Sequence, residues 1–408
     1  MNGIKKYWLT LLLLTSVDTI IFGTNINKTI LFVPRILGLI SIIAFPIIKS
    51  GTLNKFFLKT KDLWAVFIMF VIMSISSVIN SESFVTYISK TISVLLAYSI
   101  CQFYSKKEFA CIFDDFMTLV SCFAVSIELM AYIIPSLLRK LPTVTNTASG
   151  TFYTCFFGSI QSGNLYNQYI RANGVFWEPG AFAIYLVFAM MIQLFVLDKI
   201  NIKRVIIYFI LIVFTFSTTG YVTLGVLLLT FIISDRTAEM SNGLKTLFIL
   251  LILGFTGFMF YSDNTIIYDG VIGKLTSGTS SATTRYSSIF NGIKVIFDHP
   301  LFGVASRSQD FMYDYVHSSE NKYTNGGTII ANTIIGWSVN FGLVFGSLFV
   351  VGTLKYLKKY AHSIIEWILL SIVIIMAYSG ERFFSFFPFI YVFYGLKKGN
   401  ECNENSGD

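Results

Sequence analysis

Long apolar runs recur along the whole of this 408-residue sequence and constrain its fold more than any other feature. Segments such as 222–233 and 247–260 carry no charged residue and are apolar on every face. The runs match the length of a helix that crosses a hydrocarbon core of roughly 30 Å. A membrane barrel instead needs strands of about ten residues in which apolar and polar side chains alternate. The runs therefore predict an all-α, polytopic integral membrane protein.

The composition excludes an ordinary soluble globule. Hydrophobic residues make up 54% of the chain and charged residues only 13%, which leaves too little polar surface to cover a soluble protein of this size. A net charge of +8 would suggest nucleic acid as the partner of a soluble protein, but here Lys and Arg lie in short clusters between apolar runs. Such clusters report membrane topology. We therefore expect no nucleic acid partner, and membrane lipid as the main solvent.

About 12 transmembrane helices are expected, in a single membrane domain of residues 1–408. The predicted spans are 7–22, 30–48, 63–79, 86–103, 116–134, 180–197, 205–217, 221–234, 247–261, 329–353, 364–378 and 383–394. The seventh and eighth spans are short and only a few residues separate them. A tight hairpin that does not fully cross the membrane is therefore the alternative at that point.

The distribution of Lys and Arg predicts the orientation. With the N-terminus inside, eighteen of these residues fall in cytoplasmic segments, and only Lys28, Arg35, Lys90 and Arg382 fall in short outer segments. Cytoplasmic loops of membrane proteins carry the excess of basic residues. Because the number of spans is even, we expect both termini in the cytoplasm.

Two long segments, 135–179 and 262–328, are expected to be periplasmic loops. They hold the remaining basic residues, which are Arg139, Lys140, Arg171, Lys274, Arg285, Lys294, Arg307 and Lys322. Long translocated loops do not follow the charge rule, so these residues need another explanation. An anionic ligand such as a phosphate is the simplest one, and solvated loop charge is the alternative.

The second long loop contains a candidate amphipathic helix near 285–298, with Thr284 as its cap. Apolar residues recur in it at spacings of three and four, namely Tyr286, Ile289, Phe290, Ile293, Ile296 and Phe297. His299 and Pro300 are expected to end it. The helix is too short to span a membrane, so we expect it at the membrane surface with Arg285 at its start. Packing against the bundle is the alternative.

The segment 171–180, with the sequence RANGVFWEPG, places an Arg and a carboxylate at the outer end of the sixth span. Pro179 suits the first turn of a helix, so Glu178 is expected at a helix N-terminus beside the membrane. A carboxylate at that position can simply stabilise the helix. Because Glu178 is one of few acidic groups near basic ones at the outer surface, it is also a candidate for chemistry.

Three motifs together resemble those of Wzy-type polysaccharide polymerases, which share a fold with the O-antigen ligases. The first is the Arg-x-x-Gly-x-Phe-x-Glu-Pro pattern of residues 171–179. The second begins at Arg285, runs through the amphipathic segment and ends in a His-Pro-Leu-x-Gly element at 299–303. The third opens at Asn332 and extends to Gly346. Their order and the expected topology are similar to those of the family from residue 171 onwards.

The resemblance implies a glycosyltransferase that polymerises undecaprenyl-diphosphate-linked oligosaccharide repeat units into O-antigen or capsular polysaccharide, at the periplasmic face of the bacterial inner membrane. Glu178 would be the base that activates the acceptor hydroxyl, while Arg171 and Arg285 would contact the diphosphate. Further substrate-binding candidates are Arg307, His299, His317 and Asn332. No cofactor or metal is implied. The implied partners are the undecaprenyl-diphosphate-linked glycan, membrane lipid and a chain-length regulator.

Two other functions remain open. Ligases place a His immediately before the Asn of the third motif, and this chain has Ala331 there, which counts against an O-antigen ligase. His317 is the candidate to replace that His, and an exposed loop residue is the alternative interpretation. A lipid-linked oligosaccharide flippase or other transporter would also explain about 12 spans. Transporters, however, concentrate polar groups near the midplane and often show repeated halves, and this sequence shows neither.

Overall fold

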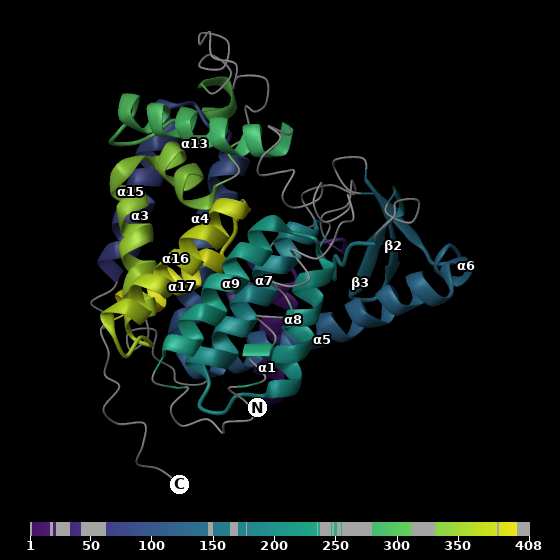
Figure 1. The fold of residues 1–408 in the computed structure, drawn as a ribbon. Coiled ribbons are helices and arrows are strands. Elements are labelled where there is room, and N and C mark those ends of the chain that lie inside the picture. The colour runs from purple at the N-terminus through teal and green to yellow at the C-terminus, as the bar shows by residue number, and fades with distance from the viewer. Residues whose placement is uncertain are drawn as a thin grey trace.

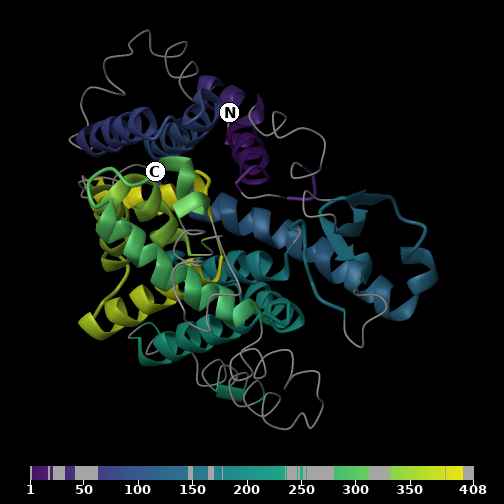
Figure 2. The ribbon, with the colours of Figure 1, turned by 90° about the horizontal axis from the view of Figure 1, so that it is seen from above.

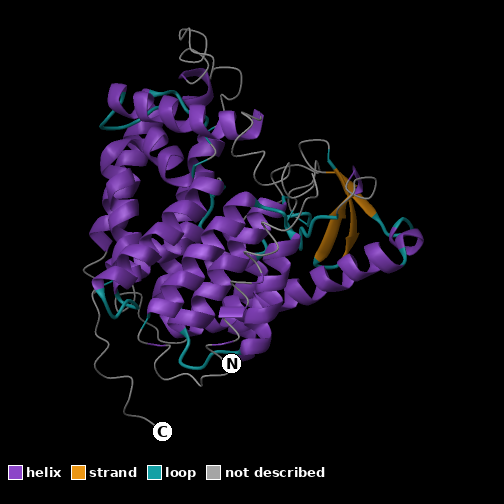
Figure 3. Cartoon of the chain, in the orientation of Figure 1, coloured by secondary structure: helices purple, strands orange, loops and turns teal. Residues whose placement is uncertain are grey.

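The computed structural model describes residues 2–16, 19–21, 33–41, 63–145, 150–163, 170–176, 178–234, 236, 246, 249–250, 254, 280–311, 330, 332–381 and 383–397. The side chains of residues 2–4 and 280–287 lie outside this description. Helices dominate the described chain, and its strands form one small sheet (Figure 3).

The helices are mostly apolar and several exceed four turns. They are α1 (Asn2–Leu13), α3 (Leu63–Ile79), α4 (Phe84–Phe103), α5 (Lys106–Ile133), α6 (Pro135–Leu138), α7 (Pro179–Met191), α8 (Ile202–Phe214), α9 (Thr218–Ile233), α13 (Ser280–Asp298), α15 (Thr333–Lys358), α16 (Ile364–Gly380) and α17 (Phe387–Leu396). A π-helix, η3 (Ile192–Val196), continues α7, and a 3-10 helix, η6 (Ala305–Arg307), follows α13.

Four described helices are long and apolar enough to cross a membrane, namely α4, α5, α7 together with η3, and α15. The helices α3, α9, α16 and α17 are apolar but shorter. Most predicted spans overlap a described helix. Two spans are described only in part, namely the second, of which the helical residues 33–41 are described, and the ninth, of which the helical residues 249, 250 and 254 are described. The described part of the chain is thus a bundle of apolar helices.

The outward faces of the helices suit a lipid surrounding. On α16 the exposed side chains include Ile364, Ile365, Ile368, Ile372 and Ile375, and residues at spacings of three and four share one helix face. Soluble monomers rarely expose contiguous apolar surface of this kind. The bundle therefore has the character of a membrane protein.

Helix α7 forms the centre of the bundle. Every residue of α7 and η3 is buried, and the helices α5, α8, α9 and α16 all contact α7 (Figure 1). A helix can be apolar on all sides when protein surrounds it on all sides. The first turn of α7 is where this buried helix reaches one end of the bundle.

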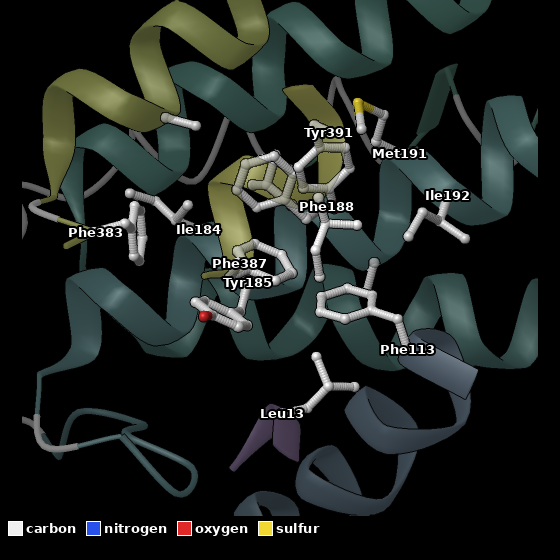
Figure 4. Packing of buried hydrophobic residues seen from close by; sticks show 14 of the residues in the cluster. Leu13, Phe113, Ile184, Tyr185, Phe188, Met191, Ile192, Phe383, Phe387 and Tyr391 are labelled. Atoms are coloured by element: carbon white, nitrogen blue, oxygen red, sulfur yellow. The ribbon is translucent and has the colours of Figure 1, made fainter. Parts of the chain in front are cut away.

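Aromatic side chains join α7 to α5 and α17. The ring of Tyr185 stacks on Phe387 with centroids 4.6 Å apart, and Phe387 stacks on Phe113 at 5.2 Å (Figure 4). Phe188 stacks on Tyr391 at 5.2 Å. Such pairs contribute about 0.5–1.5 kcal/mol each beyond the burial of their surface. They hold the three helices together in the middle of the bundle.

One end of the bundle, which we call the basic end, collects Lys and Arg side chains in ion pairs. Lys6 of α1 lies 2.6 Å from Asp115 of α5, and Arg204 of α8 lies 2.8 Å from the same carboxylate. Lys107 of α5 pairs with Asp198 at 3.0 Å. The starts of α1, α5 and α8 therefore lie together at this end.

The opposite end, which we call the carboxylate end, holds the segment that leads into α7. Ile20, which follows α1, donates its N–H to the carbonyl of Val175 at 2.9 Å. Ala172 donates its N–H to the carbonyl of Phe214, the last residue of α8, also at 2.9 Å. The far ends of α1 and α8 thus meet beside the start of α7, where Glu178 lies.

The first long loop contains a three-stranded antiparallel sheet, which the expectation of an all-α fold did not include. The strands β1 (Thr143–Thr145), β2 (Thr151–Cys155) and β3 (Gly158–Gln161) pair in sequence order. They are rich in Thr, Tyr, Phe and Val, which favour a pleated, half-buried surface. Strand β3 packs on α5, and the sheet lies to one side of the bundle (Figure 2).

Helix α15 is interrupted at Gly342, where φ is 83° and ψ is 178°, a conformation that is nearly restricted to glycine. The turn after α13 fills the break. Val304 donates its N–H to the carbonyl of Val339 at 2.9 Å, and Leu343 donates its N–H to the carbonyl of Pro300 at 2.7 Å. Backbone groups that the break would leave unpaired are satisfied in this way.

Gly303, in the turn after α13, allows this turn to approach the backbone of α15 closely. Its φ is 62°, and a Cβ on it would lie closer than 3.0 Å to backbone atoms of Val339, Asn340 and Phe341. The His-Pro-Leu-x-Gly turn, residues 299–303, and the broken helix α15 therefore form one unit, which we call the clamp. The second and third sequence motifs meet in it, backbone against backbone.

Helix α13 lies crosswise over the end of α15 (Figure 1). Gly292 packs against Ile335 of α15, and Val295 is buried. Phe290 and Phe297, in contrast, are 65% and 72% exposed. The apolar residues that the sequence placed on one face are thus divided between a side that packs on the bundle and a side that points outward.

Candidate functional site

Glu178 stands at the start of the central helix. Its backbone is extended, with φ −129° and ψ 127°, and its carbonyl accepts a helical hydrogen bond from the N–H of Phe182 at 3.2 Å. Its side chain is exposed and makes no capping hydrogen bond. Pro179 occupies the first helical position. The backbone therefore holds the carboxylate at a defined place, and helix capping does not occupy its oxygens.

A second carboxylate, that of Glu381, lies beside Glu178. Gly180 reveals this, because a Cβ built on it would lie 3.9 Å from Oε1 of Glu178 and would collide with Oε1 of Glu381. The two carboxylates approach the same point over the first turn of α7, although they are far apart in the sequence. Sequence reasoning missed Glu381. The available signal was a Glu-Arg pair, 381–382, set between two apolar runs.

Glu381 connects several helix ends. It follows α16 in an extended conformation, and its carbonyl accepts a hydrogen bond from Oγ1 of Thr333 at 2.7 Å. The same hydroxyl oxygen accepts the N–H of Phe383 at 3.0 Å. The preceding Gly380 packs against Thr219 at the start of α9. The N-termini of α7, α9 and α15 thus converge around this one residue.

The convergence of helix N-termini has an electrostatic consequence. Each helix N-terminus carries roughly half a positive charge from its unpaired N–H groups. Carboxylates and phosphates are therefore favoured at such ends. At the carboxylate end this charge suits an anionic group beside Glu178 and Glu381.

Arg171 is half-buried and is bound to the end of α8. Its Nε donates to the carbonyl of Thr215 at 2.9 Å, and its Nη2 donates to the carbonyl of Phe216 at 3.3 Å. A cation near a helix C-terminus satisfies the last carbonyls and interacts favourably with the helix dipole. Arg171 therefore fixes the loop that leads to Glu178. The sequence had predicted only a contact with phosphate for this residue and not this structural role.

Asn332 is buried and begins α15. Its Oδ1 accepts the N–H of Ile335 at 3.0 Å, and its Nδ2 donates to Oγ of Ser379 at 3.0 Å. Thr333, the next residue, holds the carbonyl of Glu381. Asn332 thus caps α15 and ties it to α16 beside the second carboxylate, and both polar atoms of its side chain take part.

His299 and Arg307 are brought together around Phe311. The ring centroids of His299 and Phe311 lie 4.8 Å apart, and the guanidinium of Arg307 lies 5.5 Å from the Phe311 ring. Arg307 is 54% exposed and pairs with Asp310 at 3.5 Å. His299 belongs to the clamp, and Arg307 and Phe311 follow its turn in the chain. None of the three belongs to the first turn of α7, and Arg307 is exposed.

Three residues that the sequence singled out fall wholly or partly on parts that the structure does not describe. His317 and Ala331 lie outside the described residues, and so does the side chain of Arg285, whose backbone belongs to α13. Within the described ranges, no group of three or more His, Cys, Asp or Glu side chains is arranged to hold a metal ion.

Comparison with known protein families, with curated proteins and with solved structures finds no match to this chain. Its function is therefore inferred from its motifs and from the arrangement of its own residues.

Proposed function

We propose that this chain polymerises undecaprenyl-diphosphate-linked oligosaccharide repeat units into O-antigen or capsular polysaccharide at the periplasmic face of a bacterial inner membrane. The observation that carries the proposal is the position of Glu178, an exposed carboxylate without a capping bond at the opening of the central helix. The resemblance of the three motifs to Wzy-type polymerases supplies the substrate class.

In the proposed step, a hydroxyl of the acceptor sugar attacks the anomeric carbon of the donor sugar. The bond from that carbon to the diphosphate oxygen breaks, and undecaprenyl diphosphate leaves with the bonding electron pair. Glu178 takes the proton of the attacking hydroxyl, which is a poor nucleophile until it loses that proton. The lipid diphosphate is already an activated leaving group, so the reaction needs no nucleotide.

The surroundings of Glu178 suit an anionic donor on a lipid. Converging helix N-termini offer partial positive charge there. The exposed Arg307, which pairs with Asp310 in the segment after the clamp turn, offers a further cation at the surface. We propose that Arg285, which belongs to α13, binds phosphate oxygens through the planar donors of its guanidinium. The outward-facing Phe290 and Phe297 of the same helix are apolar, which is expected of a helix that lies in the membrane surface.

The first prediction concerns orientation. We propose that the basic end is cytoplasmic and the carboxylate end is periplasmic, because basic residues accumulate on the cytoplasmic side. In spheroplasts, a membrane-impermeant maleimide is expected to label a variant that retains only Cys155, on β2, without permeabilisation. A variant that retains only Cys402 is expected to react only after permeabilisation. Labelling of Cys402 in intact spheroplasts would refute the topology.

The second prediction concerns the product. A strain that lacks the protein is expected to accumulate a single repeat unit on the lipid anchor, because the donor is made but never joined to an acceptor. Analysis of the lipid-linked and surface glycans measures this directly. Long chains left on the lipid anchor would indicate a ligase instead, and the absence of any outward-facing intermediate would indicate a flippase. A chain-length regulator is a further proposed partner.

A further inference from the structure

We propose that Glu381 is a positioning residue for Glu178, and that Gly180 is glycine because the carboxylate of Glu381 occupies the space of its missing side chain. The inference rests on the proposed function of Glu178 as the base. It adds a residue from the loop between α16 and α17, outside all three sequence motifs.

The contact at Gly180 is the first observation. A Cβ on this residue would collide with Oε1 of Glu381 and would lie 3.9 Å from Oε1 of Glu178. Gly180 is the second residue of α7, with a φ that does not require glycine. Its lack of a side chain is therefore explained by the close approach of Glu381 and not by backbone conformation.

The anchoring of Glu381 is the second observation. Thr333 binds the backbone on both sides of it, through the Glu381 carbonyl at 2.7 Å and the N–H of Phe383 at 3.0 Å. Gly380 packs against Thr219 of α9. These contacts fix the backbone at Glu381, and so they set the point from which its side chain reaches the first turn of α7.

The two carboxylates have different roles, since Glu178 is the proposed base and Glu381 positions it. Glu178 makes no capping hydrogen bond, whereas Glu381 places its negative charge against the first turn of α7, where the helix dipole favours it. Because Oε1 of Glu381 fills the space over Gly180, the carboxylate of Glu178, which approaches the same point, is held to one side of it. An acceptor hydroxyl arriving from that side meets a base that is already oriented.

A double-mutant cycle tests the inference. The full-length protein is purified and assayed with lipid-linked repeat units extracted from the strain that lacks it. Gly180→Ala is expected to lower turnover by roughly 10- to 100-fold, because a misplacement of about 1 Å in a catalytic group costs on the order of 100-fold. The half-saturating substrate concentration is expected to change little. Adding Glu381→Asp, which shortens the side chain by one methylene, makes room for the new Cβ and is expected to restore most of the lost turnover.

Two controls complete the cycle. Gly225→Ala, in α9, adds a methyl group where no atom lies within 4 Å, and it is expected to leave turnover unchanged. Glu381→Gln keeps the size but removes the charge, and it is expected to lower turnover while the thermal midpoint stays near that of the wild type. Full turnover in Gly180→Ala or in Glu381→Gln would overturn the inference, and so would a double variant no better than Gly180→Ala.

The design separates this inference from the proposed function. If the wild-type protein does not lengthen the extracted repeat units, the function is wrong. The contact between Gly180 and Glu381 is then tested by thermal stability alone. The single variant Gly180→Ala should unfold at a lower temperature than the double variant that also carries Glu381→Asp. If the wild type is active and the cycle shows no rescue, only the role of Glu381 is wrong.

Discussion

Glu178→Gln is expected to abolish chain elongation while the protein still accumulates in the membrane. Gln keeps the size of the side chain and can accept a hydrogen bond, but it cannot take a proton from the acceptor hydroxyl. Loss of a general base typically lowers the rate by about 10²- to 10⁴-fold. The measurement is the length distribution of the glycan in a deletion strain complemented with the variant, at matched protein abundance.

Magnitudes separate this loss from a structural one. Removing a charge from an exposed helix N-terminus costs about 0.3–1 kcal/mol, whereas a 10²- to 10⁴-fold loss of rate corresponds to roughly 3–5 kcal/mol in the activation barrier. Because the Glu178 side chain makes no capping bond, the smaller figure applies to stability. A drop in protein level equal to the drop in activity would therefore point to folding and not to chemistry.

Asp198→Asn is the matched control for Glu178→Gln. Asp198 is an exposed carboxylate at the basic end, where it pairs with Lys107 at 3.0 Å, and exposed pairs of this kind contribute little to stability. The variant removes an acidic group without touching the carboxylate end and is expected to elongate chains normally. Long chains in Glu178→Gln at normal abundance would transfer the role of the base to His299 or His317.

Gly342→Ala is expected to cause the largest loss of stability. The backbone conformation at Gly342, with φ 83° and ψ 178°, is strained for any other residue, and a Cβ there would lie closer than 3.0 Å to the carbonyl oxygens of Pro300 and Leu301. Strain and overpacking together cost roughly 2–6 kcal/mol. The turn of the clamp must move away, and the hydrogen bond between Leu343 and Pro300 is lost with it.

The thermal unfolding midpoint of the detergent-purified protein measures this effect, together with protein abundance in the membrane. Both are expected to fall for Gly342→Ala. Gly225→Ala serves as the control, because it makes the same substitution in an apolar helix where space is open. An unchanged midpoint for Gly342→Ala would show that the clamp is not a rigid contact, and the second and third motifs would then need another explanation.

The sequence by itself determined that this chain forms apolar helices suited to a membrane. Whether a run of residues suits lipid depends on the side chains within that run, so the predicted spans from 63–79 to 221–234 lie close to helices α3 to α9. The helix start at Glu178 followed from a local signal, the Pro after it. Apolar spacing likewise predicted a helix near 285–298, but α13 begins at Ser280, so Thr284 lies inside the helix and does not cap it. The sheet of β1, β2 and β3 also had a local signal, the Thr, Tyr and Phe residues of its first two strands, but the prediction of an all-α fold relied on helical periodicity and did not include it.

The tertiary structure alone decided what the singled-out residues do. Arg171 binds the carbonyls that end α8, Gly303 meets the break at Gly342, and Glu381 stands over Gly180. Each contact joins segments that are distant in the chain, and it exists because helix packing brings particular ends of the bundle to the same place. Residue type and spacing carry no information about that meeting, because they record only what a segment can do by itself.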